Sequence, residues 1–164
     1  MIDLLSTSIL VIGLVDDLRS RKIHNQLLYV LLAISILVIF TLRGVSGVGF
    51  GTMSATIGIA LMFPLAYFNV VGGGDLKLFG LFAFTSEPHA VLMIFAYAII
   101  AGASIGLVRA ALSGQLKAAI FNTATIAMNK GLSKPLAGLA IPYSAALLAG
   151  WLAYWSLLDQ GGVI

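Results

Sequence analysis

Long apolar runs recur along the whole sequence, and this feature limits the possible folds more than any other. A transmembrane helix needs about 20 apolar residues to cross about 30 Å of hydrocarbon. Segments that approach or reach this length cover 3–18, 26–43, 49–69, 75–87, 90–110 and 136–158. We therefore predict an all-α membrane protein, a polytopic bundle of about six transmembrane helices that forms a single domain over residues 1–164.

The composition agrees with this class. The chain is 60% hydrophobic and only 9% charged, with a mean hydropathy of +1.08, whereas soluble domains are about a quarter charged. Cysteine is absent, which excludes disulfides and a thiolate zinc site. The first charge is the acidic Asp3, and the basic cluster follows the first apolar run, so this run does not have the pattern of a removable signal peptide.

The basic residues predict the orientation, because Lys and Arg are enriched in cytoplasmic loops. Placing the 19–25 loop in the cytoplasm leaves only Arg43 outside. The basic residues on the cytoplasmic side are then Arg19, Arg21, Lys22, Lys77, Arg109, Lys117, Lys130 and Lys134. We expect a multi-pass protein of the cytoplasmic (inner) membrane, with lipid as a partner. Since topology accounts for the positive charge, we expect no nucleic-acid partner.

The same topology places three acids, Asp16, Asp17 and Asp75, at the cytoplasmic ends of the two shortest predicted spans. Ionisable residues at such a depth usually face a polar cavity or one another. Two close carboxyl groups cannot both ionise easily and share a proton. The ionised group can take a proton from water while the protonated group hydrogen-bonds to a carbonyl, as in an aspartic peptidase. The glycines at 72–74 would let an extended substrate backbone lie close to Asp75.

Simpler roles fit the same residues. Asp75 is placed to act as the N-cap of the fourth helix, with the glycines before it forming a turn. Asp17 can pair with Arg19 or Arg21 at the membrane interface. Lys77 can extend to lipid phosphates, or it can favour the ionised form of a neighbouring carboxylate.

Other kinds of site receive little support. His24 and His89 are predicted on opposite sides of the membrane, so they cannot bind one metal ion together. We find no Gly-rich phosphate loop, Ser-His pair or metal-ligand cluster in the sequence, and we expect no metal and no cofactor. A non-enzymatic membrane subunit or a small transporter, with the acids as ion or proton sites, is the alternative from a different functional class.

Three segments resemble the type IV prepilin peptidase family. GGGDLK at 72–77 matches the GxGD motif, which a Lys commonly follows, and DLRSRKIHN at 17–25 resembles the first aspartate motif, D-L-R, a basic patch and I-P-N. IPYSAALLAG at 141–150 resembles the last-helix segment, often I-P-Y-G. The three segments lie in the order and spacing of the family, and the six-span layout covers essentially the whole chain.

The resemblance implies a membrane aspartic endopeptidase (a hydrolase) that removes the short basic leader of prepilins or pseudopilins, in type IV pilus biogenesis and protein secretion. Cleavage would take place at the cytoplasmic face. It implies that Asp17 and Asp75 are the catalytic pair, because the D-L-R register selects Asp17 over Asp16. The predicted substrate-binding residues are Gly72, Gly74 and Lys77.

The chain is similar to the short family branch without the cysteine-containing N-terminal domain, as in tight-adherence (Flp-type) pilus systems. Two positions depart from the family pattern. His24 replaces the usual Pro, and Ser144 replaces the usual Gly, a change we expect to affect packing more than chemistry. A presenilin-like intramembrane protease shares GxGD, but it carries a Tyr before its first aspartate, and Val15–Asp16–Asp17 has no Tyr.

Overall fold

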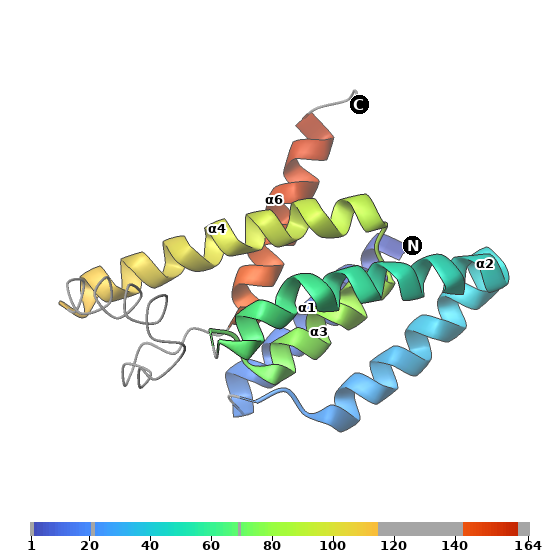
Figure 1. Cartoon of the computed structure of the whole chain (residues 1–164), viewed down its shortest axis with the longest axis horizontal. Coiled ribbons are helices and arrows are strands. Elements are labelled where there is room, and N and C mark those ends of the chain that lie inside the picture. Colours follow the sequence, from blue (N-terminus) through green and yellow to red (C-terminus); the bar gives the residue numbers. More distant parts are fainter. Residues whose placement is uncertain (1, 21, 69, 115–142, 161–164) are drawn as a thin grey trace.

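The computed structural model describes residues 2–20, 22–68, 70–114 and 143–160 (Figure 1). In these ranges the chain forms α1 (Ile2–Ser20), α2 (Asn25–Tyr67), α3 (Gly73–Phe84), α4 (Pro88–Leu112) and α6 (Tyr143–Gln160), with no strand. The all-α class is therefore confirmed for the described part of the chain. Most of the predicted loop at 113–135, and the predicted start of the last span at 136, lie outside the described residues.

The prediction of six transmembrane helices is not supported. The predicted spans 26–43 and 49–69 correspond to the two limbs of α2, which are separated by the non-helical backbone of Gly44 (φ 67°, ψ −161°), where the chain turns back (Figure 1). Among the described helices, only α2 and α4 are long and apolar enough to cross a membrane. The 12 residues of α3 rise only about 18 Å along the helix axis. The ends of α1 carry charged residues, which shorten its apolar part.

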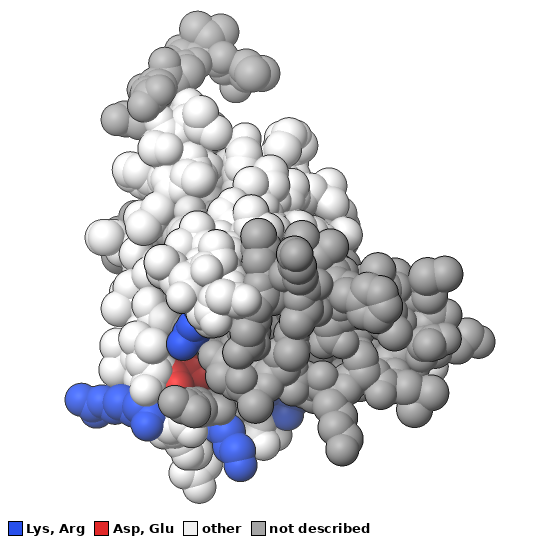
Figure 2. Space-filling view, turned by 90° about the vertical axis from the view of Figure 1, so that its left-hand side faces the viewer, with Lys and Arg blue, Asp and Glu red and all other residues white. Residues whose placement is uncertain are grey.

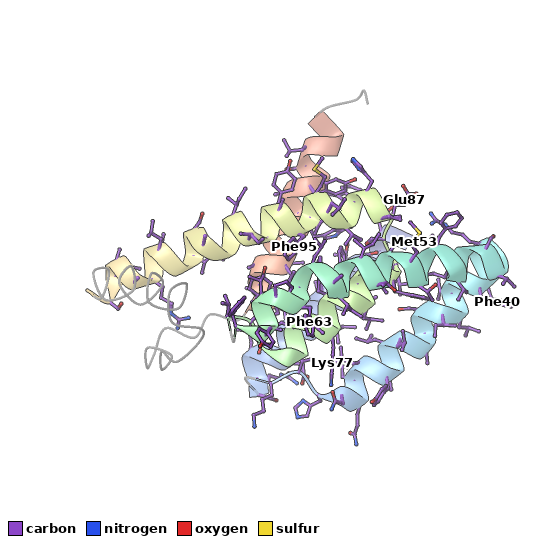
Figure 3. The ribbon with its side chains drawn as sticks, viewed as in Figure 1. Phe40, Met53, Phe63, Lys77, Glu87 and Phe95 are labelled. Atoms are coloured by element: carbon purple, nitrogen blue, oxygen red, sulfur yellow. The ribbon has the colours of Figure 1, made fainter. Side chains whose placement is uncertain are left out.

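Helix α3 occupies the centre of the bundle, where it contacts α1, α2 and α6. Its residues from Leu78 to Phe84 are all buried, and Leu78, Phe79 and Phe82 have no exposed surface. A helix that is apolar on every side is expected at the centre of a bundle. In contrast, α2 exposes large apolar side chains such as Phe40 and Phe63 (Figure 3), which is suitable for contact with lipid.

Close helix contacts hold α3 in this central position. A Cβ atom on Gly51 would lie 2.7 Å from the carbonyl oxygen of Phe84, and one on Gly58 would lie 2.7 Å from the Cβ of Ala83. Both glycines belong to the second limb of α2, at 45–67. Small residues thus let this limb approach α3 closely, as is common between membrane helices.

The helix ends gather at two opposite ends of the bundle. We call one the aspartate end: there the C-terminus of α1 lies near the N-terminal ends of α2, α3 and α6, and the C-terminal end of α4 extends beyond them on the same side (Figure 1). At the opposite end, Arg43 precedes the reversal of α2 and pairs with Glu87 at 4.0 Å. Lys77 and Glu87 lie towards these two different ends (Figure 3). Of the described basic residues, Arg19, Lys22, Lys77 and Arg109 belong to segments at the aspartate end.

Candidate active site

The neighbouring acids of α1 point in different directions, because consecutive residues of a helix are about 100° apart. Asp17 Oδ2 accepts a hydrogen bond from the Ser144 hydroxyl of α6 at 2.7 Å. Asp16 instead binds His24, whose backbone N–H donates to Asp16 Oδ2 at 2.8 Å and whose Nδ1 lies 3.0 Å from Asp16 Oδ1. Only Asp17 therefore faces the start of α6.

Asp75 lies in the first turn of α3. The N-cap of this helix is Gly72, with extended backbone angles and no side-chain cap, so the alternative in which Asp75 is itself the N-cap is wrong. Asp75 is the third helical residue, and the backbone N–H of Gly72 is directed at its carboxyl group. This is the position of the carboxylate in a capping box, so a helix-stabilising role remains open to Asp75 at a different position from the N-cap.

The two predicted acids come together at the start of α6. Asp17 and Asp75 are close enough to interact electrostatically. Ser144 faces both, because its hydroxyl donates to Asp17 while its backbone N–H is directed at the Asp75 carboxyl group. The catalytic role of the pair stays a prediction, but its members do face one another.

Sequence reasoning missed the role of two residues beside this pair. Ser144 was expected to affect packing more than chemistry; it is buried, and its hydroxyl also donates a hydrogen bond to Asp17. Tyr143 lies near the charge of Asp75. Their place within the predicted span 136–158 gave no signal of this, because contacts between helices far apart in the chain do not follow from hydropathy.

Two polar atoms at the site have no hydrogen-bond partner among the described residues. They are Asp75 Oδ1 and the hydroxyl oxygen of Tyr143, and both are buried. Buried polar atoms are normally hydrogen-bonded. Neither atom has such a partner within the described ranges, so both remain available as hydrogen-bonding groups of the site.

The glycines before Asp75 differ in their surroundings. A Cβ on Gly74 would lie 3.1 Å from the Cβ of Ile23, so Gly74 allows α3 to pack against the loop after α1. A Cβ on Gly72 would approach Asp75 Oδ2 to 3.2 Å, while one on Gly73 would meet nothing within 4 Å. Gly72 and Gly73 are exposed, so the open backbone beside the acid is at these two residues rather than at Gly74.

Among the described contacts, Lys77 and Arg19 form no ion pair with Asp17 or Asp75. Lys77 Nζ donates to Asn25 Oδ1 at 2.9 Å, which connects α3 to the start of α2. Within the described residues, Asp17 forms no ion pair with Arg19, and Arg21 lies outside them. Figure 2 shows acidic atoms in a gap between Lys and Arg side chains, seen from this side of the bundle. The described ranges hold no group of three side chains that could bind a metal ion.

Comparison with known proteins identifies the family. Residues 4–107 match the model of the type IV leader peptidase family, a region that includes both aspartate segments but not the last helix. No curated protein and no solved structure matches the chain. The match confirms the resemblance to prepilin peptidases and indicates a membrane-associated protease. The chain belongs to the type IV leader peptidase family.

Proposed function

We propose that this protein is a membrane aspartic endopeptidase that removes the short basic leader of a prepilin or pseudopilin, with Asp17 and Asp75 as its catalytic pair. The observation that carries the proposal is the meeting of these two acids, from α1 and α3, at the N-terminus of α6. Family membership supports the peptidase class over a transporter or a non-enzymatic subunit.

The pair would hydrolyse a peptide bond by general acid–base chemistry. The ionised carboxylate takes a proton from water, whose oxygen attacks the scissile carbonyl carbon, while the protonated carboxyl group hydrogen-bonds to the carbonyl oxygen. The tetrahedral intermediate then collapses, the C–N bond breaks and the amine leaves with a proton. Two like charges placed close together favour this singly protonated state over double ionisation.

The neighbouring residues suggest how a substrate backbone is held. Gly72 and Gly73 leave open space beside Asp75, where no side chain would obstruct an extended peptide. The unpartnered hydroxyl of Tyr143 and Asp75 Oδ1 supply polar atoms on the buried side. Gly74 and Lys77, also predicted to bind substrate, would act less directly, since they contact Ile23 and Asn25.

We further propose that the aspartate end faces the cytoplasm in a multi-pass arrangement across the cytoplasmic (inner) membrane. Four described basic residues belong to segments at this end, and Arg43 lies at the other, as the positive-inside rule requires. Both limbs of α2 are apolar along most of their length, and so is α4. The leader of a prepilin would then be cut where it emerges from the membrane.

The test is co-expression with candidate prepilins, with removal of the leader read as a gel shift. Asp17→Asn and Asp75→Asn should each reduce cleavage by more than about 10³-fold, since acid–base catalysis alone contributes about 10²–10⁴-fold. The double variant should be no worse than either single variant, because paired catalytic groups act as a unit.

Asp16→Asn is the matched control, because Asn keeps an oxygen that can accept the His24 backbone N–H. It should retain most of the cleavage activity. A purely helix-stabilising role for Asp75 predicts the opposite pattern, since Asn preserves most of that interaction. An Asp75→Asn protein that cleaves at nearly the wild-type rate would therefore refute the aspartic mechanism.

A further inference from the structure

Ser144 stands where the resembling family usually has a glycine, and its side chain is fully buried. Its hydroxyl donates to Asp17 Oδ2 over 2.7 Å, and its backbone N–H is directed at Asp75. A glycine would keep the N–H and lose the hydroxyl. The contact with Asp17 therefore comes from a side chain that the family pattern lacks.

The two carboxyl groups have unequal partners. Asp17 Oδ2 accepts an O–H donor near the length typical of a charge-assisted bond, about 2.5–2.7 Å. Asp75 is faced by two backbone N–H groups, but its Oδ1 is buried and has no partner among the described residues. An ionised Asp75 would leave that oxygen uncompensated, which is costly. A protonated Asp75 carries no charge at that buried position, which lowers this cost.

We propose that Ser144 is a positioning residue that holds Asp17 in its ionised form and so leaves the shared proton on Asp75. This inference rests on the proposed function, because it assigns the two protonation states within the same pair. Asp17 is then the group that takes a proton from the attacking water. Asp75 is the group that hydrogen-bonds to the scissile carbonyl oxygen.

The remaining charged residues near the end of α1 do not replace this contact. Asp16 is bound to His24 at the start of α2. Arg19 forms no ion pair with Asp17 within the described residues. Within the described residues, Ser144 is thus the side chain that donates a hydrogen bond to the Asp17 carboxylate.

The titratable groups on α3 and α6 do not donate hydrogen bonds to Asp17 within the described residues. Lys77 of α3 donates to Asn25 of α2. Tyr143 of α6 lies in the field of Asp75, so its hydroxyl is placed to affect the protonated member of the pair. Neither residue supplies the donor that Asp17 receives from Ser144.

Loss of the hydroxyl should move only one limb of the pH profile. The Ser144 hydroxyl stabilises Asp17 whenever Asp17 is ionised, in the singly and in the doubly ionised pair. It therefore favours loss of the first proton and has little effect on loss of the second. A hydrogen bond to a charged group corresponds to about one to two pH units. We expect about one unit here, since Asp17 is only partly buried.

The test measures the pH dependence of kcat for Ser144→Ala in full-length protein in detergent micelles. The probe is a synthetic peptide with a basic leader, a glycine and an apolar segment. Ser144→Gly is the second variant, because it carries the residue usual in the family and removes the same hydroxyl. Ser35→Ala is the matched control, since Ser35 is equally buried but bonds to its own helix at the Leu31 carbonyl oxygen.

We expect the acidic limb to move up by about one pH unit in both Ser144 variants, with the alkaline limb unchanged. Ser35→Ala should move neither limb. If the Ser144 variants keep the wild-type profile, or if both limbs move together, the inference is wrong while the proposed function stands. Wild-type protein that cleaves no such peptide would contradict the proposed function and, with it, this inference.

Discussion

The reversal of α2 depends on the backbone of Gly44, and replacing this residue by alanine isolates that dependence. Its angles of φ 67° and ψ −161° lie in a region that is essentially restricted to glycine. A Cβ atom added at Gly44 meets no atom within 4 Å, so steric contact with neighbours contributes nothing. The expected cost of Gly44→Ala is therefore the backbone strain alone, about 1–3 kcal/mol.

Gly49 provides a matched control in the same helix. A Cβ atom at Gly49 also meets nothing within 4 Å, but this residue lies within a regular helical stretch of α2. Alanine in a helix interior is more favourable than glycine by about 0.5–1 kcal/mol. Two exposed glycines five positions apart in the sequence should thus respond to the same substitution with opposite signs.

The assay is thermal unfolding in detergent micelles, followed by helical circular dichroism at one fixed scan rate. For a chain of this size, each 1 kcal/mol shifts the Tm by about 2–4 °C. Gly44→Ala should lower the Tm by roughly 2–12 °C, and Gly49→Ala should raise it by about 1–4 °C. Equal shifts for the two variants, or an unchanged Tm for Gly44→Ala, would show that the reversal does not require a glycine conformation.

Two further predictions concern His24, the N-cap of α2, and Tyr143, the first described residue of α6. His24→Pro should fit the backbone, since φ of His24 is −74°. The substitution removes the backbone N–H that binds Asp16, while the rigidity of proline is stabilising. We expect the free energy of unfolding to fall by about 1 kcal/mol in total. In an Asp16→Ala background the same substitution should stabilise instead, as measured by Tm. Tyr143→Phe should not lower the Tm and should raise it slightly, because it removes a buried hydroxyl with no described partner. It should lower kcat on the prepilin peptide about tenfold; a wild-type kcat would remove Tyr143 from the substrate site.

The class of the protein and the location of its acids could be predicted from the sequence, since both follow from local properties. The lengths of apolar runs and the scarcity of charge indicate membrane helices. The alternation of spans places Asp17 and Asp75 on one side, and the helix period separates Asp16 from Asp17. Six spans are not supported, because only α2 and α4 of the described helices are long and apolar enough to cross a membrane. Apolar length also does not show that the runs 26–43 and 49–69 form the two limbs of α2, which turns back at Gly44.

The partners of the acids depend on the tertiary structure, because they come from segments far apart in the chain. Ser144 meets Asp17 only because α6 packs against α1 in one register, where Trp151 Nε1 donates to Thr7 Oγ1 at 2.8 Å. The close contact of Gly150 with Ala98 of α4 fixes the other side of α6. Hydropathy and helical period carry no information about such a register. The sequence by itself thus determined which acids lie at one end of the bundle, and only side-chain packing between helices decided what each of them binds.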